Sequence, residues 1–183
     1  MHVKTVIAIT GASGAIYGKR LLETLSGEKT LIISDTAREI IKFELGIDAE
    51  DLERLADFFY RNDDLFAPIS SGSQFFDAMV IAPCSEGTIA KIAAGIADSL
   101  ITRVAAVAMK EGRTLVLVPR ETPLSAVMLE NQLKLCKLGV KILPACPAFY
   151  HNPRTVDDLV DFVVGKVLDQ IGETHNLFRR WRA

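Results

Sequence analysis

Small and hydroxyl-bearing residues follow three short apolar runs of the chain, and their types suit them to bind an anion. They are the segment TGASG at residues 10–14, the single serine Ser34, and the segment SEGT at residues 85–88. Small residues let backbone N–H groups approach a phosphate at a helix N-terminus, and hydroxyls add further donors. Taken alone, residues 10–14 are explained about as well by a tight turn, and Ser34 is better explained as a helix cap. Because the feature occurs three times, we favour a phosphate-binding site.

Charged side chains later in the chain could bind a second phosphate. Arg103 and Lys110 lie seven residues apart on one predicted helix, hence roughly on one face, and Arg120-Glu121 stands between two prolines. Cations on a helix face are usually only solvated. Combined with an arginine at a strand end, they would form an anion site. Tyr150 follows the next apolar run, where it either packs against the core or donates its hydroxyl.

Glu44 is a further candidate for chemistry, because it shares a predicted helix with Ala37, Ile40 and Ile41 and lies near their apolar face. A solvated glutamate is the default interpretation, but a partly buried one would suit proton transfer. Hydrolase triads and metal sites are not supported, because none of the three histidines lies in a matching motif. No tyrosine is followed four places later by lysine, which excludes the short-chain dehydrogenase pair.

These candidates must be positioned by short apolar runs that alternate with longer helical patterns. Such runs are typical of parallel strands whose two faces are both covered by helices. The predicted strands are residues 6–9, 31–33, 79–82, 115–118 and 141–143, and helices are predicted to begin near residues 14, 35, 85, 99 and 124. This alternation indicates an α/β fold, a doubly wound parallel sheet of the Rossmann or flavodoxin-like kind forming a three-layer sandwich, with ligands at the carboxyl ends of the strands.

The last helix has the clearest pattern, because apolar residues from Val156 to Ile171 form one stripe at helical spacing. Thr155 is placed to cap this helix, with Asp157 and Asp158 in its positive first turn. Residues 48–64 are charged and irregular, and we predict a surface helix and loop there. Residues 179–182 fall outside the apolar periodicity.

Composition limits the class of protein. With 183 residues, 49% of them apolar, the chain can bury one substantial core, and we expect a single domain over residues 1–183. A formal net charge of -2 provides no broad field for nucleic acid or an anionic membrane. No signal peptide or membrane span is recognisable, so we expect a soluble, cytoplasmic protein. Without CxxC spacing, reduced and buried thiols are expected at Cys84, Cys136 and Cys146.

Taken together, these segments resemble the UbiX-type flavin prenyltransferases over nearly the whole chain. The matching stretches include TGASGAIYG, SGSQFFDAMVIAPCSEGT, VPRETPLS, FYHNP and the closing RRW, a highly specific combination in this order. The resemblance implies an oligomeric flavoprotein, usually a dodecamer built from trimers, with sites between subunits. It also implies that reduced FMN is a substrate, alkylated at N5 by dimethylallyl phosphate and closed to a fourth ring at C6 without a metal. The product, prenylated FMN, serves UbiD-type decarboxylases.

The resemblance further implies roles for individual residues. FMN would be held by Gly11, Ala12, Ser13, Ser34, Ser85, Glu86, Gly87, Thr88 and Arg103. The prenyl phosphate, which could be a monophosphate or a diphosphate, would be held by Lys110, Arg120, Tyr150 and Lys166, partly from a neighbouring subunit. Glu121 would transfer protons near the phosphate, Ser13 and Glu44 would act near the flavin N5, and Trp181 would face the developing allyl cation. The tail, about residues 173–183, would close the site.

The chain departs from some relatives at two positions. Leu65 stands where an aromatic residue can lie, which weakens the case for a full aromatic cage. Lys166 stands where arginine can lie, so it keeps the charge but loses the bidentate fork.

Two other functions stay open on the sequence. FMN-dependent oxidative cysteine decarboxylases have the same fold, but their early catalytic histidine and their PASANT and PxMNxxMW stretches are missing, with PCSEGT and VPRETPLS in place of the two stretches. A non-catalytic flavin carrier is the second alternative. The cations Lys110 and Arg120 argue against a carrier, because storage needs no second phosphate site.

Overall fold

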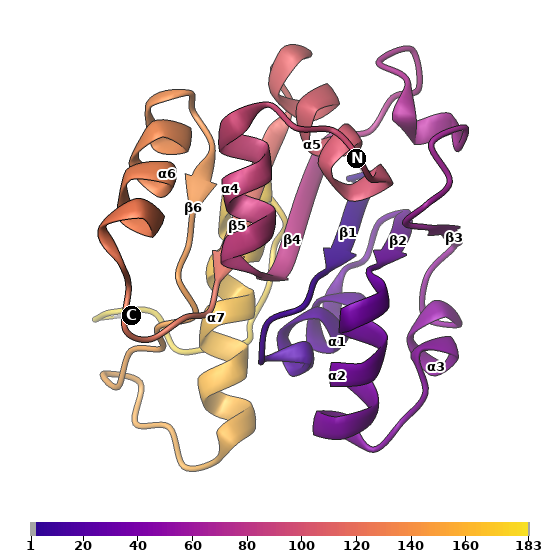
Figure 1. Ribbon diagram of the computed structural model, residues 1–183. Helices are drawn as coiled ribbons and strands as arrows, with labels where there is room; N and C mark the ends of the chain where they lie inside the picture. Colours follow the sequence, from indigo (N-terminus) through magenta and orange to yellow (C-terminus); the bar gives the residue numbers. More distant parts are fainter. Residues whose placement is uncertain (1–2, 183) are drawn as a thin grey trace.

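Six parallel strands form one sheet within residues 3–182, the part of the chain that the computed structural model describes (Figure 1). The strand order is β3-β2-β1-β4-β5-β6. The strands are Thr5–Ile9 (β1), Lys29–Ile33 (β2), Phe58–Arg61 (β3), Ala78–Cys84 (β4), Thr114–Pro119 (β5) and Lys141–Ile142 (β6). Because the order reverses between β1 and β4, the loops after these two strands diverge and leave a crevice at the carboxyl edge of the sheet.

Helices cover both faces of the sheet. They are Ala15–Thr24 (α1), Asp35–Leu45 (α2), Ala49–Glu53 (α3), Glu86–Ala94 (α4), Leu100–Lys110 (α5), Ala126–Lys137 (α6) and Val156–Ile171 (α7), with a 3-10 turn at Pro68–Ser70 (η1). Side chains of α1, α2 and α7 form the core on one face, and those of α4, α5 and α6 form the core on the other. This three-layer arrangement confirms the predicted fold class.

The central strands are apolar throughout because both of their faces are buried. On β1, Ile7 and Ile9 belong to the core under α1 and α7, whereas Val6 and Ala8 belong to the core under α4 and α5. All four side chains are at most 1% exposed. A strand with this pattern can only lie inside the sheet, and it holds the loop that follows it in a fixed place.

The predicted helix starts are confirmed, and all except the one at Gly14 carry a side-chain cap. In the capped helices a serine or threonine oxygen accepts a backbone N–H of the first turn, a contact typically worth about 1 kcal/mol. The capping residues are Ser34, Ser85, Ser99, Ser125 and Thr155. Three of these helices, α2, α4 and α5, begin beside the crevice, because their capping serines Ser34, Ser85 and Ser99 all lie there.

Two sequence predictions are wrong. Residues 48–64 contain the predicted helix, but Phe58–Arg61 is a strand that pairs with β2 rather than a loop. As an edge strand with one neighbour it is only half buried, so it lacks the continuous apolar run of the central strands. Cys84 is buried as expected, whereas Cys136 and Cys146 are exposed.

The described part of the chain contains no helix that combines the length and the hydropathy of a membrane span.

Candidate functional site

A cavity of about 290 Å³ lies at the carboxyl ends of β1, β2 and β4. Hydroxyl, amide and small residues dominate its wall, together with one lysine. The lining residues are Thr10, Gly11, Ser34, Thr36, Asn62, Ser85, Gly87, Thr88, Lys91, Ser99, Ile101 and Thr102. The sequence therefore predicted correctly that the segments after three strands meet at one edge of the sheet.

The N-termini of α4 and α5 both open on this cavity. Ser85 caps α4 by accepting the N–H of Thr88 at 3.3 Å, and Ser99 caps α5 by accepting the N–H of Thr102 at 3.4 Å. Helix N-termini carry a partial positive charge and are favourable positions for a phosphate. Thr10 links the strands behind them, because its Oγ1 donates to the carbonyl of Pro83 and accepts the N–H of Ser85 at 2.8 Å.

Sequence reasoning missed several of the lining residues, among them Thr36, Asn62, Lys91, Ser99 and Thr102. Asn62 follows β3, the strand that was not predicted, so its position at the sheet edge could not be inferred. Ser99 and Thr102 could have been predicted at the site, because a helix was predicted to begin near residue 99 and helix N-termini bind anions.

Glu44 occupies the N-terminus of α1. Its carboxylate accepts the N–H groups of Gly14 and Ala15, each at 2.9 Å, and the hydroxyl of Ser13. Partial burial raises the pKa of Glu44, but these hydrogen bonds outweigh burial and hold the pKa below its usual value. The α1 N-terminus, expected to approach a phosphate, is therefore already filled by a carboxylate, and an anion has to bind nearer Gly11 and α4.

Glu86 was expected among the FMN contacts, but it does not line the cavity. Its Oε1 accepts an N–H of Gln132 on α6 at 2.8 Å, and its Oε2 is buried without a hydrogen-bond partner among residues 3–182. Burial raises the pKa of Glu86, the bond from Gln132 lowers it, and the Glu121 carboxylate raises it. Glu86 thus lies toward α6 and Glu121.

Arg120 and Glu121 stand directly after β5, beside the Ser13 loop. The Nε of Arg120 donates to the carbonyl of Ser13 at 3.3 Å. Glu121 is exposed, and its Oε1 accepts the N–H of Thr122 at 3.1 Å. The structure therefore brings together Ser13, Glu44 and the Arg120-Glu121 pair at one end of the sheet.

Tyr150 and Trp181 form a second group beside α7. Their rings meet edge to face with centroids 5.2 Å apart, although 31 residues separate them in sequence. Lys166 lies on α7, and its Nζ is 3.5 Å from Asp169. Tyr150 and Lys166, predicted to hold the prenyl phosphate, and Trp181, predicted to face the allyl cation, thus all lie on or beside α7.

Lys110 is not part of this grouping within one chain. It ends α5, which has 11 residues and so rises about 15 Å from the cavity edge at Ser99. Its ammonium pairs with Glu111, near Gly72 at the opposite edge of the sheet. Arg103 lies one turn into α5, where its Nε donates to the carbonyl of Ser70 at 2.9 Å.

A larger cavity, of about 460 Å³, lies beside β2 and β3. Its arginines pair with its own carboxylates, Arg38 with Glu50 and Glu53, and Arg61 with Asp63. These pairs neutralise the arginines of that cavity. Lys91 of the crevice between β1 and β4 is paired as well, with Asp98 at 2.7 Å, so the crevice differs in its wall of hydroxyls and helix N-termini rather than in charge.

Comparisons with known proteins agree with this geometry. A family model described as flavoprotein matches residues 1–168. The chain is 50% identical over 181 residues to flavin prenyltransferase UbiX of Methanocaldococcus jannaschii, with 98% of each chain covered. The structure of AnUbiX (PadA1) in complex with FMN and dimethylallyl pyrophosphate is 41% identical with a TM-score of 0.96, over 99% of this chain and 98% of that chain. A dodecameric FMN-dependent UbiX-like decarboxylase from Escherichia coli O157:H7 is 48% identical with a TM-score of 0.95, over 98% of this chain and 100% of that chain.

Proposed function

The chain belongs to the UbiX-type flavin prenyltransferases of the flavoprotein family, and from this premise we propose that it transfers a dimethylallyl group from dimethylallyl phosphate to N5 and C6 of reduced FMN. The observation that carries the proposal is that donors for a second anion lie outside the hydroxyl-lined cavity at the strand ends. Arg120 stands beside the Ser13 loop, whereas Tyr150 and Lys166 lie at α7, and the family resemblance assigns all three to the prenyl phosphate. A flavin carrier needs only the cavity, whereas a transferase must also bind a leaving phosphate.

The cavity fits the phosphate of FMN. Two capped helix N-termini point at it, and its wall supplies several hydroxyls. Its one lysine, Lys91, is paired with Asp98 at 2.7 Å. Ser34, Ser85, Gly87 and Thr88 would hold this phosphate. The flavin, once reduced, supplies the nucleophilic nitrogen and carbon of the reaction.

Ser13 and Glu44 would manage the proton at the flavin nitrogen. The hydroxyl hydrogen of Ser13 is held by the Glu44 carboxylate, so the lone pairs of the Ser13 oxygen are left to accept an N–H. Because hydrogen bonds keep Glu44 ionised, it orients Ser13 rather than supplying a proton itself.

Arg120, Glu121, Tyr150 and Lys166 would act at the other reactant. Breaking the bond between the prenyl carbon and the phosphate oxygen leaves an anion and an allylic cation. Cationic and hydroxyl donors stabilise the departing phosphate, and Glu121 is placed to exchange a proton with it. The ring of Trp181 would stabilise the cation through its face.

We propose a homo-oligomer, a dodecamer like the Escherichia coli O157:H7 relative, with sites shared between subunits. Lys110 supports this, because it reaches the prenyl phosphate only if another subunit presents it. Several large apolar side chains are also exposed in the single chain, among them Phe43 at 92%, Phe66 at 99% and Phe149 at 70%. Packing against neighbouring subunits would cover them.

Replacing Ser34 by Ala is expected to weaken FMN binding by about 10-fold to 100-fold, because a hydrogen bond to a charged group is lost. The same change removes the cap of α2, where Ser34 Oγ accepts the N–H of Ala37 at 3.2 Å. Thr155→Ala is the matched control, since it removes the cap of α7 away from the cavity. Titration of flavin fluorescence measures the affinity. Equal affinities in the two variants would exclude Ser34 from the phosphate site.

We further propose that the enzyme works in the cytoplasm and that its product activates a UbiD-type decarboxylase. Protein-free filtrate from a reaction with reduced FMN and dimethylallyl phosphate should activate such a decarboxylase produced without its cofactor. Filtrate from a reaction with FMN alone should leave the decarboxylase inactive. Activation by both filtrates, or by neither, would contradict the proposal.

A further inference from the structure

The C-terminal tail lies along α7 and is held there by shape and charge. Gly165 makes room for it: a side-chain carbon at this position would come within 2.5 Å of the Phe178 ring and 2.6 Å of the His175 ring. The His175 side chain is only 4% exposed, although it belongs to a terminal segment. The first part of the tail, around His175 and Phe178, is therefore packed against α7.

Asp169 of α7 is the charged residue that binds the tail. Its two oxygens accept both terminal nitrogens of Arg180, at 2.6 and 2.7 Å, and His175 lies 3.3 Å away. The bond from Arg180 lowers the pKa of Asp169 to about 2, so the carboxylate is ionised throughout the neutral range. Two parallel bonds between arginine and carboxylate fix direction as well as distance.

The residue after Arg180 is Trp181, the single tryptophan of the chain. The Arg180 guanidinium also lies over the Phe178 ring at 5.0 Å, which fixes the backbone on both sides of the pair. Held in this way, Trp181 meets Tyr150 edge to face at 5.2 Å. The position of the tryptophan relative to Tyr150 therefore depends on Asp169, which touches neither ring.

Lys166 also lies at Asp169 and is held more weakly than Arg180. Its Nζ is 3.5 Å from Asp169, compared with 2.6 Å for Arg180, and its side chain is 42% exposed. A phosphate that draws Lys166 away leaves Asp169 paired with Arg180 and His175. Asp169 can thus release Lys166 to a substrate without releasing the tail.

We propose that Asp169 is a positioning residue of the prenyl-transfer site. Its ion pair with Arg180, called the latch below, holds the tail so that Trp181 stands against Tyr150. Asp169 also binds Lys166 until a prenyl phosphate binds. This inference rests on the proposed function for its kinetic consequence, but the latch itself is a property of the protein alone.

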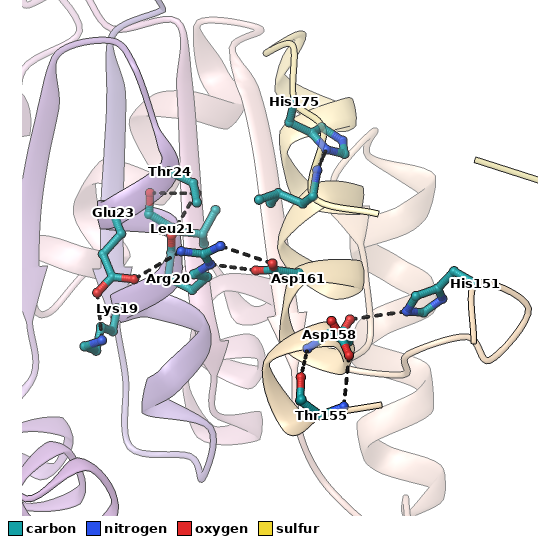
Figure 2. Close-up of polar contacts among 11 residues, drawn as sticks. Lys19, Arg20, Leu21, Glu23, Thr24, His151, Thr155, Asp158, Asp161 and His175 are labelled. Carbon is teal, nitrogen blue, oxygen red and sulfur yellow. Dashed lines mark hydrogen bonds and ion pairs between the residues drawn. The ribbon is translucent and has the colours of Figure 1, made fainter. Parts of the chain in front are cut away.

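The chain contains a matched control on the same helix. Asp161 forms a bidentate pair with Arg20 of α1, at 2.6 and 3.1 Å, which Figure 2 shows on the side of α7 that faces α1. The two carboxylates are similarly exposed, 17% for Asp161 and 21% for Asp169. Asp161→Asn therefore removes an equivalent ion pair that does not involve the tail.

The latch is tested by the fluorescence anisotropy of Trp181 in flavin-free protein, since no other tryptophan contributes. Asp169→Asn and Arg180→Gln are both expected to lower the anisotropy and to increase quenching by acrylamide, because the released tail moves on the nanosecond timescale. Asp161→Asn is expected to match the parent. The double variant should be no more mobile than either single variant, because both remove the same contact. Unchanged anisotropy in Asp169→Asn would overturn the latch.

The kinetic consequence is tested in the same variants. Asp169→Asn should lower kcat about 10-fold to 100-fold through misplacement of Trp181. Its FMN affinity should stay within about twofold, and its KM for dimethylallyl phosphate should not rise, because Lys166 loses a competing carboxylate. A kcat equal to that of Asp161→Asn would overturn the positioning role. If the parent forms no product, the proposed function fails, while the anisotropy still decides whether the latch exists.

Discussion

Glu121→Gln is expected to lower turnover by about 10²-fold to 10⁴-fold, the usual contribution of a positioned acid or base. The substitution keeps the shape of the side chain but removes its ability to exchange a proton. Glu121 is exposed and bonds within its own loop, to the N–H of Thr122, so the loss of charge should not disturb the fold. FMN affinity should stay within about twofold, because Glu121 does not line the phosphate cavity.

Single-turnover measurements with saturating dimethylallyl phosphate isolate this step from substrate binding. Glu130→Gln is a suitable control, since Glu130 is also an exposed carboxylate but lies on α6. If the Glu121 variant reacts as fast as the parent, the proton-transfer role is wrong and Arg120 with Lys166 must suffice for the leaving phosphate.

Lys110→Ala is expected to cost about 10²-fold or more in the use of dimethylallyl phosphate while FMN binding is retained, because an ammonium would leave the phosphate site. Within one chain this residue cannot act beside Glu121. The six residues of β5 separate them, a length of about 20 Å. The expected loss therefore tests whether the site is shared between subunits.

Mixed oligomers make that test decisive. Subunits carrying Lys110→Ala and subunits carrying Glu121→Gln should each assemble into nearly inactive oligomers. Co-assembled in equal amounts, they should recover about a quarter of the parent activity. If each site takes Lys110 from one chain and Glu121 from another, about a quarter of the sites receive both native residues. Mixtures without recovery would contradict a site shared between subunits. A Lys110→Ala oligomer that is itself fully active would show that Lys110 is not in the site.

The sheet could be predicted from the sequence because its central strands are buried on both faces. A run such as residues 6–9 has no other place in a small α/β protein, and Ser34 and Ser85 mark where β2 and β4 lead into helices. The edge strand Phe58–Arg61 could not be predicted in this way, because its burial is partial and its neighbours are charged. Asn62 was missed at the cavity for the same reason.

The candidate site was predictable in its residue types and less so in its contacts. The role of Glu44 at the N-terminus of α1 requires Gly14 and Glu44 to meet across 30 residues, which no local pattern encodes. The side that Glu86 faces depends on Gln132 of α6, and the docking of the tail depends on the absence of a side chain at Gly165. Such pairings arise only when the elements pack.

The most direct measurement is the mass of the flavin after purified protein is mixed without oxygen with reduced FMN and dimethylallyl phosphate. The account predicts a product heavier than FMN by one isoprenyl unit, formed in proportion to enzyme and absent from reactions without a prenyl donor. The diphosphate donor is measured in parallel, because the site could prefer either. Recovery of only unmodified FMN with both donors would contradict the account, and oxidative decarboxylation of a peptide ending in cysteine would then be the reaction to assay.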